Sequence, residues 1–400
     1  MGAADQEAMM DTLVDQARAL DALGYAEWLA GYDERAHDYF EEGLELLRSG
    51  GYPMNEAEML LRIGNLYLSR RKPVEAKALM GRALARYREL GAPEGAIDAL
   101  QALARVASDG HAYDEASALL SDALVVARAI GVPGTEATVL ADLASVESDR
   151  GRPTAARAKL DMAIRIARRS DDKHQEADLV GRKADDALRR HRRGDARRLY
   201  ERARALNREV RRAAGEASAL LGLNHVAQER GDFDEAARMG EEALALAEKI
   251  HDRDLTRTAM VALSVTYSDL GRHADAAEML EAVVRLDPND AGVLVDLGWI
   301  LYQAGEFKRS ISESTRALEI DPTQTHALRV LGHAYLALGR SDEADGLYWR
   351  AIDDRNEGED FVGTIKVLRK LRKQHPELPR VKEFLDRFIE AQARIVAQVG

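Results

Sequence analysis

The sequence predicts an all-α protein assembled from repeated pairs of helices, and three observations support this fold class. The 400-residue chain contains only 9 prolines and 5% aromatic residues, a composition that favours helix over sheet. A small residue recurs at intervals of forty residues, beginning with Ala36 and Ala76. Within each interval the apolar residues fall at offsets of three, four and seven, which is the spacing of an amphipathic helix.

The forty-residue interval is held by two columns of small or short side chains. One column consists of Ala36, Ala76, Ala116, Ala156, Ala196, Ala236 and Ala276. The other begins seven residues later, at Gly43, and ends at Val283. Small side chains are needed where two helices cross closely in a densely packed interior, so each column predicts a helix crossing. A fixed period of this length is typical of stacked helical repeats.

The expected elements follow in order from this register. Residues 1–16 are expected to form a lead-in helix, and six forty-residue units follow over residues 17–256. The period then shortens to thirty-four, as the spacing of Pro288 and Pro322 indicates, so three shorter units occupy residues 257–358. The six extra residues of the longer units lie at the junction with the next unit, where we expect them to lengthen the second helix by about a turn.

Glycine and proline mark the expected helix ends. Several second helices end at a glycine with a proline two residues later, as at Gly51 and Pro53. Glycine adopts the left-handed conformation that ends a helix, and proline cannot continue it. Residues 359–400 lose the repeat pattern but keep two helical stretches, 360–373 and 379–398, which predict a pair of C-terminal capping helices.

The last three units carry a specific motif. The segment Leu294-x2-Leu297-Gly298-x6-Gly305-x-Phe307-x9-Ala317-Leu318-x3-Pro322 resembles the signature of the tetratricopeptide repeat (TPR). The six earlier units match it more loosely and are tied to it by their exact period. The resemblance implies a right-handed α-solenoid of about nine helix-turn-helix units with a C-terminal helical cap. It also implies that the first helix of each unit lines the concave face, where TPR proteins bind other proteins.

Motifs for chemistry are not found in the sequence. There is no cysteine, so disulfides, thiolate metal sites and cysteine nucleophiles are excluded. Among the histidines, His326 and His333 share one expected helix, two turns apart, without a convincing third ligand nearby. We therefore expect no metal, no cofactor and no enzyme activity, because a solenoid offers an open groove rather than a closed pocket.

The membrane classes are also excluded by the sequence pattern. The longest stretch without Asp, Glu, Lys or Arg covers residues 217–228, and a helical span needs about 20 apolar residues. Asp5, Glu7 and Asp11 stand where a signal peptide carries basic residues. We expect a cytoplasmic protein with no membrane partner.

The resemblance places seven side chains of units eight and nine in the concave groove: Asp296, Trp299, Tyr302, Gln303, His326, Arg329 and His333. Trp299 and Tyr302 supply flat apolar area, and the polar members supply donors and acceptors, as a peptide anchor site needs. We expect these two aromatic residues to anchor a partner, with Asp296, Arg329 and His333 setting its orientation. The alternative is that Trp299 and Tyr302 pack against the next unit or the cap.

A second groove candidate lies near the N-terminal end and consists of Tyr25, Trp28, Arg62, Asn65 and Ser69. Here the structural alternative is stronger, because a lead-in helix often covers the apolar face of a terminal unit.

Charge is strongly segregated along the chain, whose net charge is −12. Residues 1–60 hold fourteen acidic and three basic residues, whereas residues 182–214 hold thirteen basic and five acidic ones. The basic block contains Arg189, Arg190, Arg192 and Arg193 at the turn of unit five. Three interpretations stay open for it, in decreasing order: pairing with acids of the same chain, a docking patch for a protein, and nucleic-acid binding. The acidic N-terminal part and the basic cap also allow head-to-tail contact between copies, so a homo-oligomer stays open.

These observations predict a non-catalytic protein–protein interaction scaffold or adaptor that holds a partner peptide or helix in its concave groove. The first alternative is a regulatory sensor, in which a ligand alters the pitch of the solenoid and so switches a bound effector. The second is nucleic-acid binding through residues 182–214.

Overall fold

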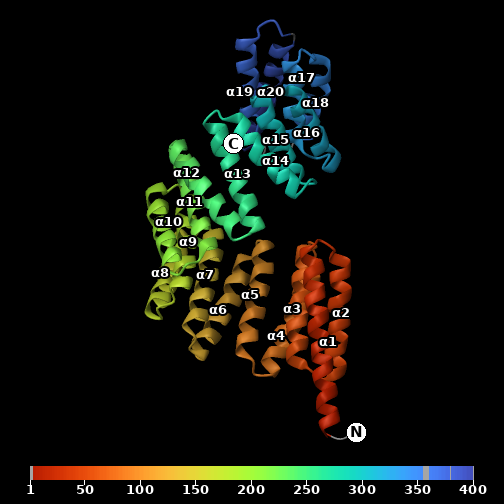
Figure 1. The fold of residues 1–400 in the computed structure, drawn as a ribbon, viewed down its shortest axis with the longest axis vertical. Helices are drawn as coiled ribbons and strands as arrows, with labels where there is room; N and C mark the ends of the chain where they lie inside the picture. Colours follow the sequence, from red (N-terminus) through yellow and green to blue (C-terminus); the bar gives the residue numbers. More distant parts are fainter. Residues whose placement is uncertain (1–2, 355–359, 379, 400) are drawn as a thin grey trace. The chain divides into compact units, whose positions relative to one another are not determined.

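The described part of the chain folds into helices joined by short turns (Figure 1). The computed structural model describes residues 3–354, 360–378 and 380–399. Over these residues there are twenty helices and no strand, which confirms the all-α prediction. The chain divides into two compact units, residues 1–186 and 187–400, with the division inside the ninth helix.

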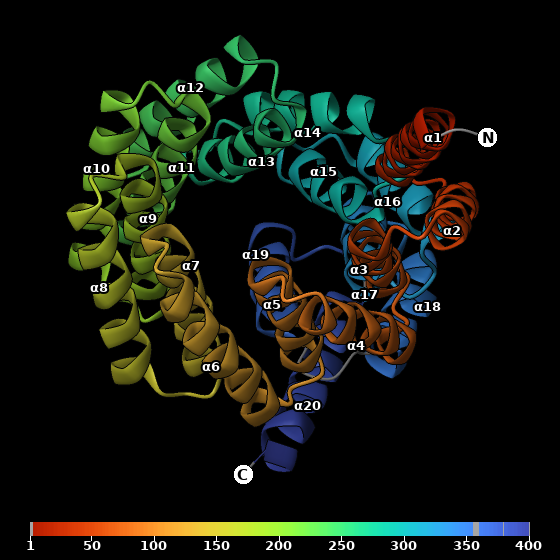
Figure 2. The same cartoon turned by 90° about the horizontal axis from the view of Figure 1, so that it is seen from below.

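The first unit consists of antiparallel helices packed in order along the chain. They are α1 (Ala3–Leu29), α2 (Asp33–Gly50), α3 (Pro53–Ser69), α4 (Pro73–Glu89), α5 (Pro93–Asp109), α6 (Tyr113–Ile130), α7 (Pro133–Asp149), α8 (Pro153–Arg169) and most of α9 (Lys173–Arg189). Contacts link α3 to α5 and α5 to α7 in addition to the contacts between sequential helices. In Figure 2 these three helices lie on the inner side of the curve, with α4, α6 and α8 outside them.

The second unit continues the same arrangement with shorter helices toward its end. It holds α10 (Arg193–Glu209), α11 (Ala213–Arg230), α12 (Phe233–Lys249), α13 (Arg253–Asp269), α14 (His273–Leu286), α15 (Ala291–Gln303), α16 (Phe307–Ile320), α17 (Thr325–Ala337), α18 (Ser341–Asp353), α19 (Val362–Gln374) and α20 (Val381–Val399). Contacts link α11 to α13, α15 to α17 and α17 to α19. The first helix of each pair therefore lies on the concave side.

The alanine column explains how closely the paired helices approach. All seven alanines of the column that begins at Ala36 and ends at Ala276 are at most 1% exposed. A methyl side chain at these positions lets the backbones cross without leaving a void, and a larger side chain would force them apart. The same column is found in helices of both units.

Most of the described turns contain one residue in the left-handed conformation. Glycine takes this position in nine of them, as at Gly51, where φ is +75°, and another residue takes it in seven. His191 takes it in the turn between α9 and α10, with φ of +54°. The left-handed region is open to glycine without steric cost, which is why glycine recurs at helix ends.

The expected boundary between a lead-in helix over residues 1–16 and the first helix of unit one is not observed, because the described residues 3–16 are continuous with that helix. No glycine after Gly2 and no proline interrupts the chain before Gly24, so nothing ends the helix there. Residues 1–2, and residues 355–358 at the end of the ninth expected unit, lie outside the described residues.

The extra residues of the long units lengthen both helices rather than the second alone. First helices such as α3 have 17 residues against 13 in α15, and second helices such as α4 have 17 against 14 in α16. Pro53 explains the difference, because it stands at the first position of α3 and starts that helix as well as following the end of α2. First helices therefore begin about one turn earlier than the expected boundaries.

The C-terminal pair forms a cap with an aromatic core. Tyr348 of α18 packs edge-on against Phe384 and Phe388 of α20, with ring centroids 5.1 and 5.2 Å apart. Phe361, just before α19, packs against Phe388 at 5.1 Å. The cap helices match the expected stretches to within two residues, and the expected start at Pro379 lies outside the described residues. This core fixes α19 beside α17, where the candidate site lies.

Candidate peptide-binding pocket

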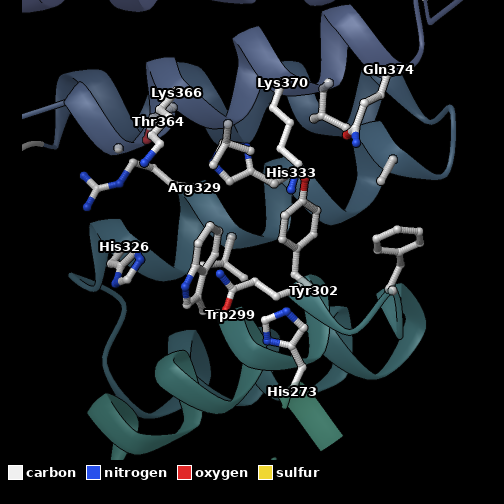
Figure 3. Close-up of a pocket in the computed structure, with 18 of the residues that line it drawn as sticks. His273, Trp299, Tyr302, His326, Arg329, His333, Thr364, Lys366, Lys370 and Gln374 are labelled. Atoms are coloured by element: carbon white, nitrogen blue, oxygen red, sulfur yellow. The ribbon is translucent and has the colours of Figure 1, made fainter. Parts of the chain in front are cut away.

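A cavity of about 720 Å³ opens on the concave side of the second unit, between α15, α17 and α19 (Figure 3). Its lining comes from three successive first helices together with residues of α14 and the turn before α16. The residues are His273, Trp299, Tyr302, Gln303, Gly305, Phe307, His326, Arg329, Val330, His333, Ala337, Asp360, Gly363, Thr364, Lys366, Val367, Lys370, Leu371, Gln374 and His375. The pocket therefore includes six of the seven groove residues predicted for units eight and nine.

Aromatic rings form one wall of the pocket. Trp299 and Tyr302 are stacked, with centroids 5.5 Å apart and an interplanar angle of 20°. They lie three residues apart on α15, so the helix presents both on the same face. Phe307 continues the wall beside Tyr302, at 5.7 Å. Burial raises the pKa of Tyr302 to about 12, so its hydroxyl stays a proton donor at neutral pH.

His333 forms the back of the pocket and is tied to the core behind it. It is only 2% exposed, and its Nδ1 atom lies 2.8 Å from the hydroxyl of buried Tyr348. Burial lowers the pKa of His333 to about 3, and the nearby charges of Arg329 and His326 act in the same direction. The imidazole is therefore neutral at physiological pH and positions the neighbouring rings, from which it lies about 6 Å away.

Cations form the opposite wall of the pocket. Arg329 projects from α17 with its guanidinium 6.0 Å from the ring of Phe361, and Lys366 and Lys370 project from α19. Among the described residues of the lining, Asp360 is the one acid, and its Oδ1 accepts a hydrogen bond from the backbone N–H of Val362 at 3.1 Å. The site combines an aromatic face with an excess of positive charge.

Asp296 is the predicted groove residue that the pocket leaves out. It is exposed on α15, one turn before Trp299, and does not line the cavity. Its surroundings displace water and raise the pKa of the carboxyl group, and the charge of Asp290 adds to this effect. Gln303 does line the pocket, and its Oε1 accepts a hydrogen bond from the hydroxyl of Ser268 at 2.9 Å.

Sequence reasoning missed the contribution of the cap helix. Thr364, Lys366, Lys370 and Gln374 line the pocket from α19, and His273 lines it from α14. The basic character of this stretch was visible, but the cap has lost the repeat signature, so no family position indicated which side chains face inward. The spacing of Lys366, Lys370 and Gln374 at four-residue intervals places them on one helix face and is the signal that identifies them.

The second groove candidate lies in the first unit, and its polar groups already have partners within the chain. The indole Nε1 of Trp28 donates to the hydroxyl of Ser69 at 3.2 Å. The Nε atom of Arg62 lies 2.6 Å from Oδ1 of Asp21. The ring of Tyr25 packs edge-on against Trp28 at 5.9 Å. The Trp28–Ser69 and Arg62–Asp21 contacts link α1 to α3, one repeat apart.

Asn65, the fifth member of this candidate, faces a separate cavity of about 500 Å³ lined by α3, α5, α6 and α7. Its Oδ1 accepts a hydrogen bond from Arg105. Farther along the same wall, Gln101 donates to Asp142 at 2.6 Å. Polar side chains thus pair across neighbouring first helices along this groove, and neither Tyr25 nor Trp28 lines the cavity.

Two of the four arginines in the basic patch at the turn between α9 and α10 pair with acids of the second unit. Arg193 lies 2.7 Å from Glu229, and Arg192 lies 3.3 Å from Asp195. Arg190 also has an interaction partner. These contacts favour the interpretation that the block pairs with acids of the chain itself.

Among the described residues, no group of three or more His, Asp or Glu side chains is arranged to hold a metal ion. None of the helices in this part of the chain is long and apolar enough to cross a membrane. The cytoplasmic location stays a prediction.

Comparison with known families decides the repeat type. Residues 215–289, 261–325 and 327–360 each match a sequence family described as tetratricopeptide repeat. The chain carries TPR repeats. The matches lie in the second unit, and the helical pairs of the first unit continue the same architecture. No curated protein matches the chain in sequence.

Several solved structures are similar in fold to parts of the chain. YrrB, described as a TPR protein with an unusual peptide-binding site, is 21% identical, with 49% of this chain and 94% of YrrB covered at a TM-score of 0.39. PilF of Pseudomonas aeruginosa is 17% identical, with 64% and 100% covered at 0.45. MamA of Desulfovibrio magneticus RS-1 is 19% identical, with 46% and 97% covered at 0.39. These similarities concern the fold alone.

Proposed function

We propose that this TPR protein is a non-catalytic interaction scaffold that holds a segment of a partner protein in the pocket of its second unit. The observation that carries the proposal is the cavity of about 720 Å³ between α15, α17 and α19, with its stacked Trp299–Tyr302 wall. Aromatic area with nearby donors is what the energetic centre of a protein interface requires. The volume accommodates a few side chains of a peptide.

The pocket is preformed, which favours binding of a flexible segment. His333 is held by Tyr348 at 2.8 Å, and Tyr348 is held in turn by the aromatic core of the cap. The receptor side chains therefore lose little freedom on binding, and the entropy cost falls mainly on the partner. This rigidity supports the role of a static scaffold over that of a sensor whose pitch changes.

The proposal is tested by measuring the affinity for a partner captured by the wild-type chain. The double variant Trp299→Ala/Tyr302→Ala removes the aromatic wall, so we expect its Kd for the purified partner to rise at least tenfold in fluorescence anisotropy. Trp349→Ala is the matched control, because Trp349 is 46% exposed on α18 and lies outside the pocket. Equal affinity of the wild type and the double variant would overturn the assignment of the pocket.

A further inference from the structure

We infer that the cap helix α19 makes the pocket selective for acidic segments, through Lys366 and Lys370. The inference rests on the proposed function and adds the chemical class of the occupant: an extended peptide with two carboxylates spaced along one side and an apolar side chain beside them. It gives the C-terminal cap a role in recognition in addition to closing the hydrophobic core of the last repeat.

The geometry places both lysines on the wall that faces the aromatic rings. Lys366, Lys370 and Gln374 follow one another at one-turn intervals along α19, and Figure 3 shows them in a row across the cavity from Trp299 and Tyr302. The lysines stand one helical turn apart, about 6 Å along the axis. Alternate residues of an extended peptide are separated by about 6.6 Å and point to the same side. Carboxylates at positions i and i+2 of a peptide therefore match the two ammonium groups.

Lys366 and Lys370 differ from many basic residues of the protein, which pair with acids of the chain and so are less available to a ligand. Arg197 pairs with Glu235 at 2.8 Å, Arg309 with Glu306 at 2.6 Å, and Arg387 with Asp345 at 2.8 Å. Within the described part of the chain, the ammonium groups of Lys366 and Lys370 have no hydrogen-bond or ion-pair partner. Their positive charge is balanced by no carboxylate on α19, whose sequence contains no Asp or Glu.

The surroundings strengthen the attraction for a carboxylate. The lysines share the cavity with apolar and aromatic side chains, including Val367 and Leu371 on the same helix. Coulombic attraction rises when low-dielectric walls replace water around a charge pair, and a cleft lined by one sign of charge concentrates ligands of the other. Of the lining residues that the structure describes, only Asp360 is acidic, and it is engaged with the backbone of α19.

Selection from random twelve-residue peptides on the immobilised full chain tests the inference. On the wild type we expect enriched sequences to be net negative, with acidic residues two positions apart next to an apolar residue. Lys366→Glu/Lys370→Glu should lose this bias. The control Arg372→Glu/Lys373→Glu makes the same change in net charge at exposed positions of α19 that do not line the pocket, and should keep it.

One enriched peptide then gives the affinities. We expect its Kd to rise at least tenfold for Lys366→Glu/Lys370→Glu and less than twofold for Arg372→Glu/Lys373→Glu, with unchanged circular dichroism for both variants. Replacing its acids by Asn and Gln should also weaken binding at least tenfold. Enrichment without a charge bias, or equal loss in both variants, would overturn the inference.

The outcomes distinguish this inference from the proposed function. Neutral peptides whose binding is lost in Trp299→Ala/Tyr302→Ala would leave the pocket as the binding site and overturn its selectivity for acids. Peptides unaffected by that double variant would overturn both. Self-association of the wild type that is lost in Lys366→Glu/Lys370→Glu would make a second copy the occupant and would overturn the choice of a foreign peptide.

Discussion

The two concave surfaces of the molecule are built from the same repeat but differ in how their polar groups are satisfied. In the first unit, Arg62 pairs with Asp21, Trp28 with Ser69, and Gln101 with Asp142, each across one repeat. In the second unit a similar series continues as far as Gln303, which pairs with Ser268. Beyond it, the wall becomes aromatic and the facing lysines of α19 have no partner among the described residues.

This difference separates a groove that holds the solenoid together from a groove that is ready for a ligand. A hydrogen bond between first helices satisfies both groups and fixes the spacing of neighbouring repeats. A partner would have to break those bonds before it could use the same groups. Polar residues at groove positions therefore indicate a binding site only when their partners within the chain are absent.

Disrupting the aromatic core of the C-terminal cap should have the largest effect on stability. Phe388 is fully buried between Tyr348 and Phe361, so Phe388→Ala is expected to lower the free energy of unfolding by about 3–5 kcal/mol through lost burial and the cavity it leaves. Urea denaturation monitored by circular dichroism measures the loss. Ile389→Ala at the neighbouring, 38% exposed position is the control and should cost much less. A similar loss in the two variants would contradict the role of this core.

His333 should make a large contribution to the dependence of stability on pH between pH 7 and pH 5. Because burial lowers its folded-state pKa to about 3, the unfolded chain binds more protons below the ordinary value of 6.5, and stability falls as the pH falls through that range. Between pH 6.5 and 5 this group alone should lower the free energy of unfolding by about 1.6 kcal/mol.

The variant His333→Gln should remove this part of the pH dependence, because the amide does not titrate and still reaches Tyr348. The exposed His111 of the first unit provides the control change His111→Gln, which should leave the profile as in the wild type. Urea denaturation at pH 7 and pH 5 compares the three proteins. An unchanged slope in His333→Gln would show that another group is responsible.

The smallest effects should differ in kind between the two grooves: substitution in the first unit should lower stability, and substitution in the second-unit pocket should lower peptide affinity. Arg62→Met deprives Asp21, whose carboxyl pKa burial raises, of its ion-pair partner, and should cost about 1 kcal/mol of stability without affecting peptide affinity. Lys366→Met should change stability by less than about 0.5 kcal/mol and weaken peptide binding. Thermal denaturation and anisotropy on both variants test this reversal. Loss of affinity in Arg62→Met would place the ligand in the first unit.

The sequence predicted the architecture because the repeat constrains residue size at fixed intervals. Ala36 and its column identify helix crossings, and Trp299 and Tyr302 follow from their register in the repeat. The helix starts were missed because Pro53 both follows one helix and begins the next. The burial of His333 and the inward face of α19 were missed because they depend on packing between the last repeat and a cap without repeat register.

The central claim is that a partner binds the second-unit pocket and not the groove of the first unit. Hydrogen–deuterium exchange of the wild-type chain, with and without a bound peptide, tests it without any mutation. We predict slower exchange in residues 299–303, 326–333 and 363–374, and unchanged exchange in residues 62–69 and 98–109. Protection confined to residues 62–69 and 98–109 would contradict the claim.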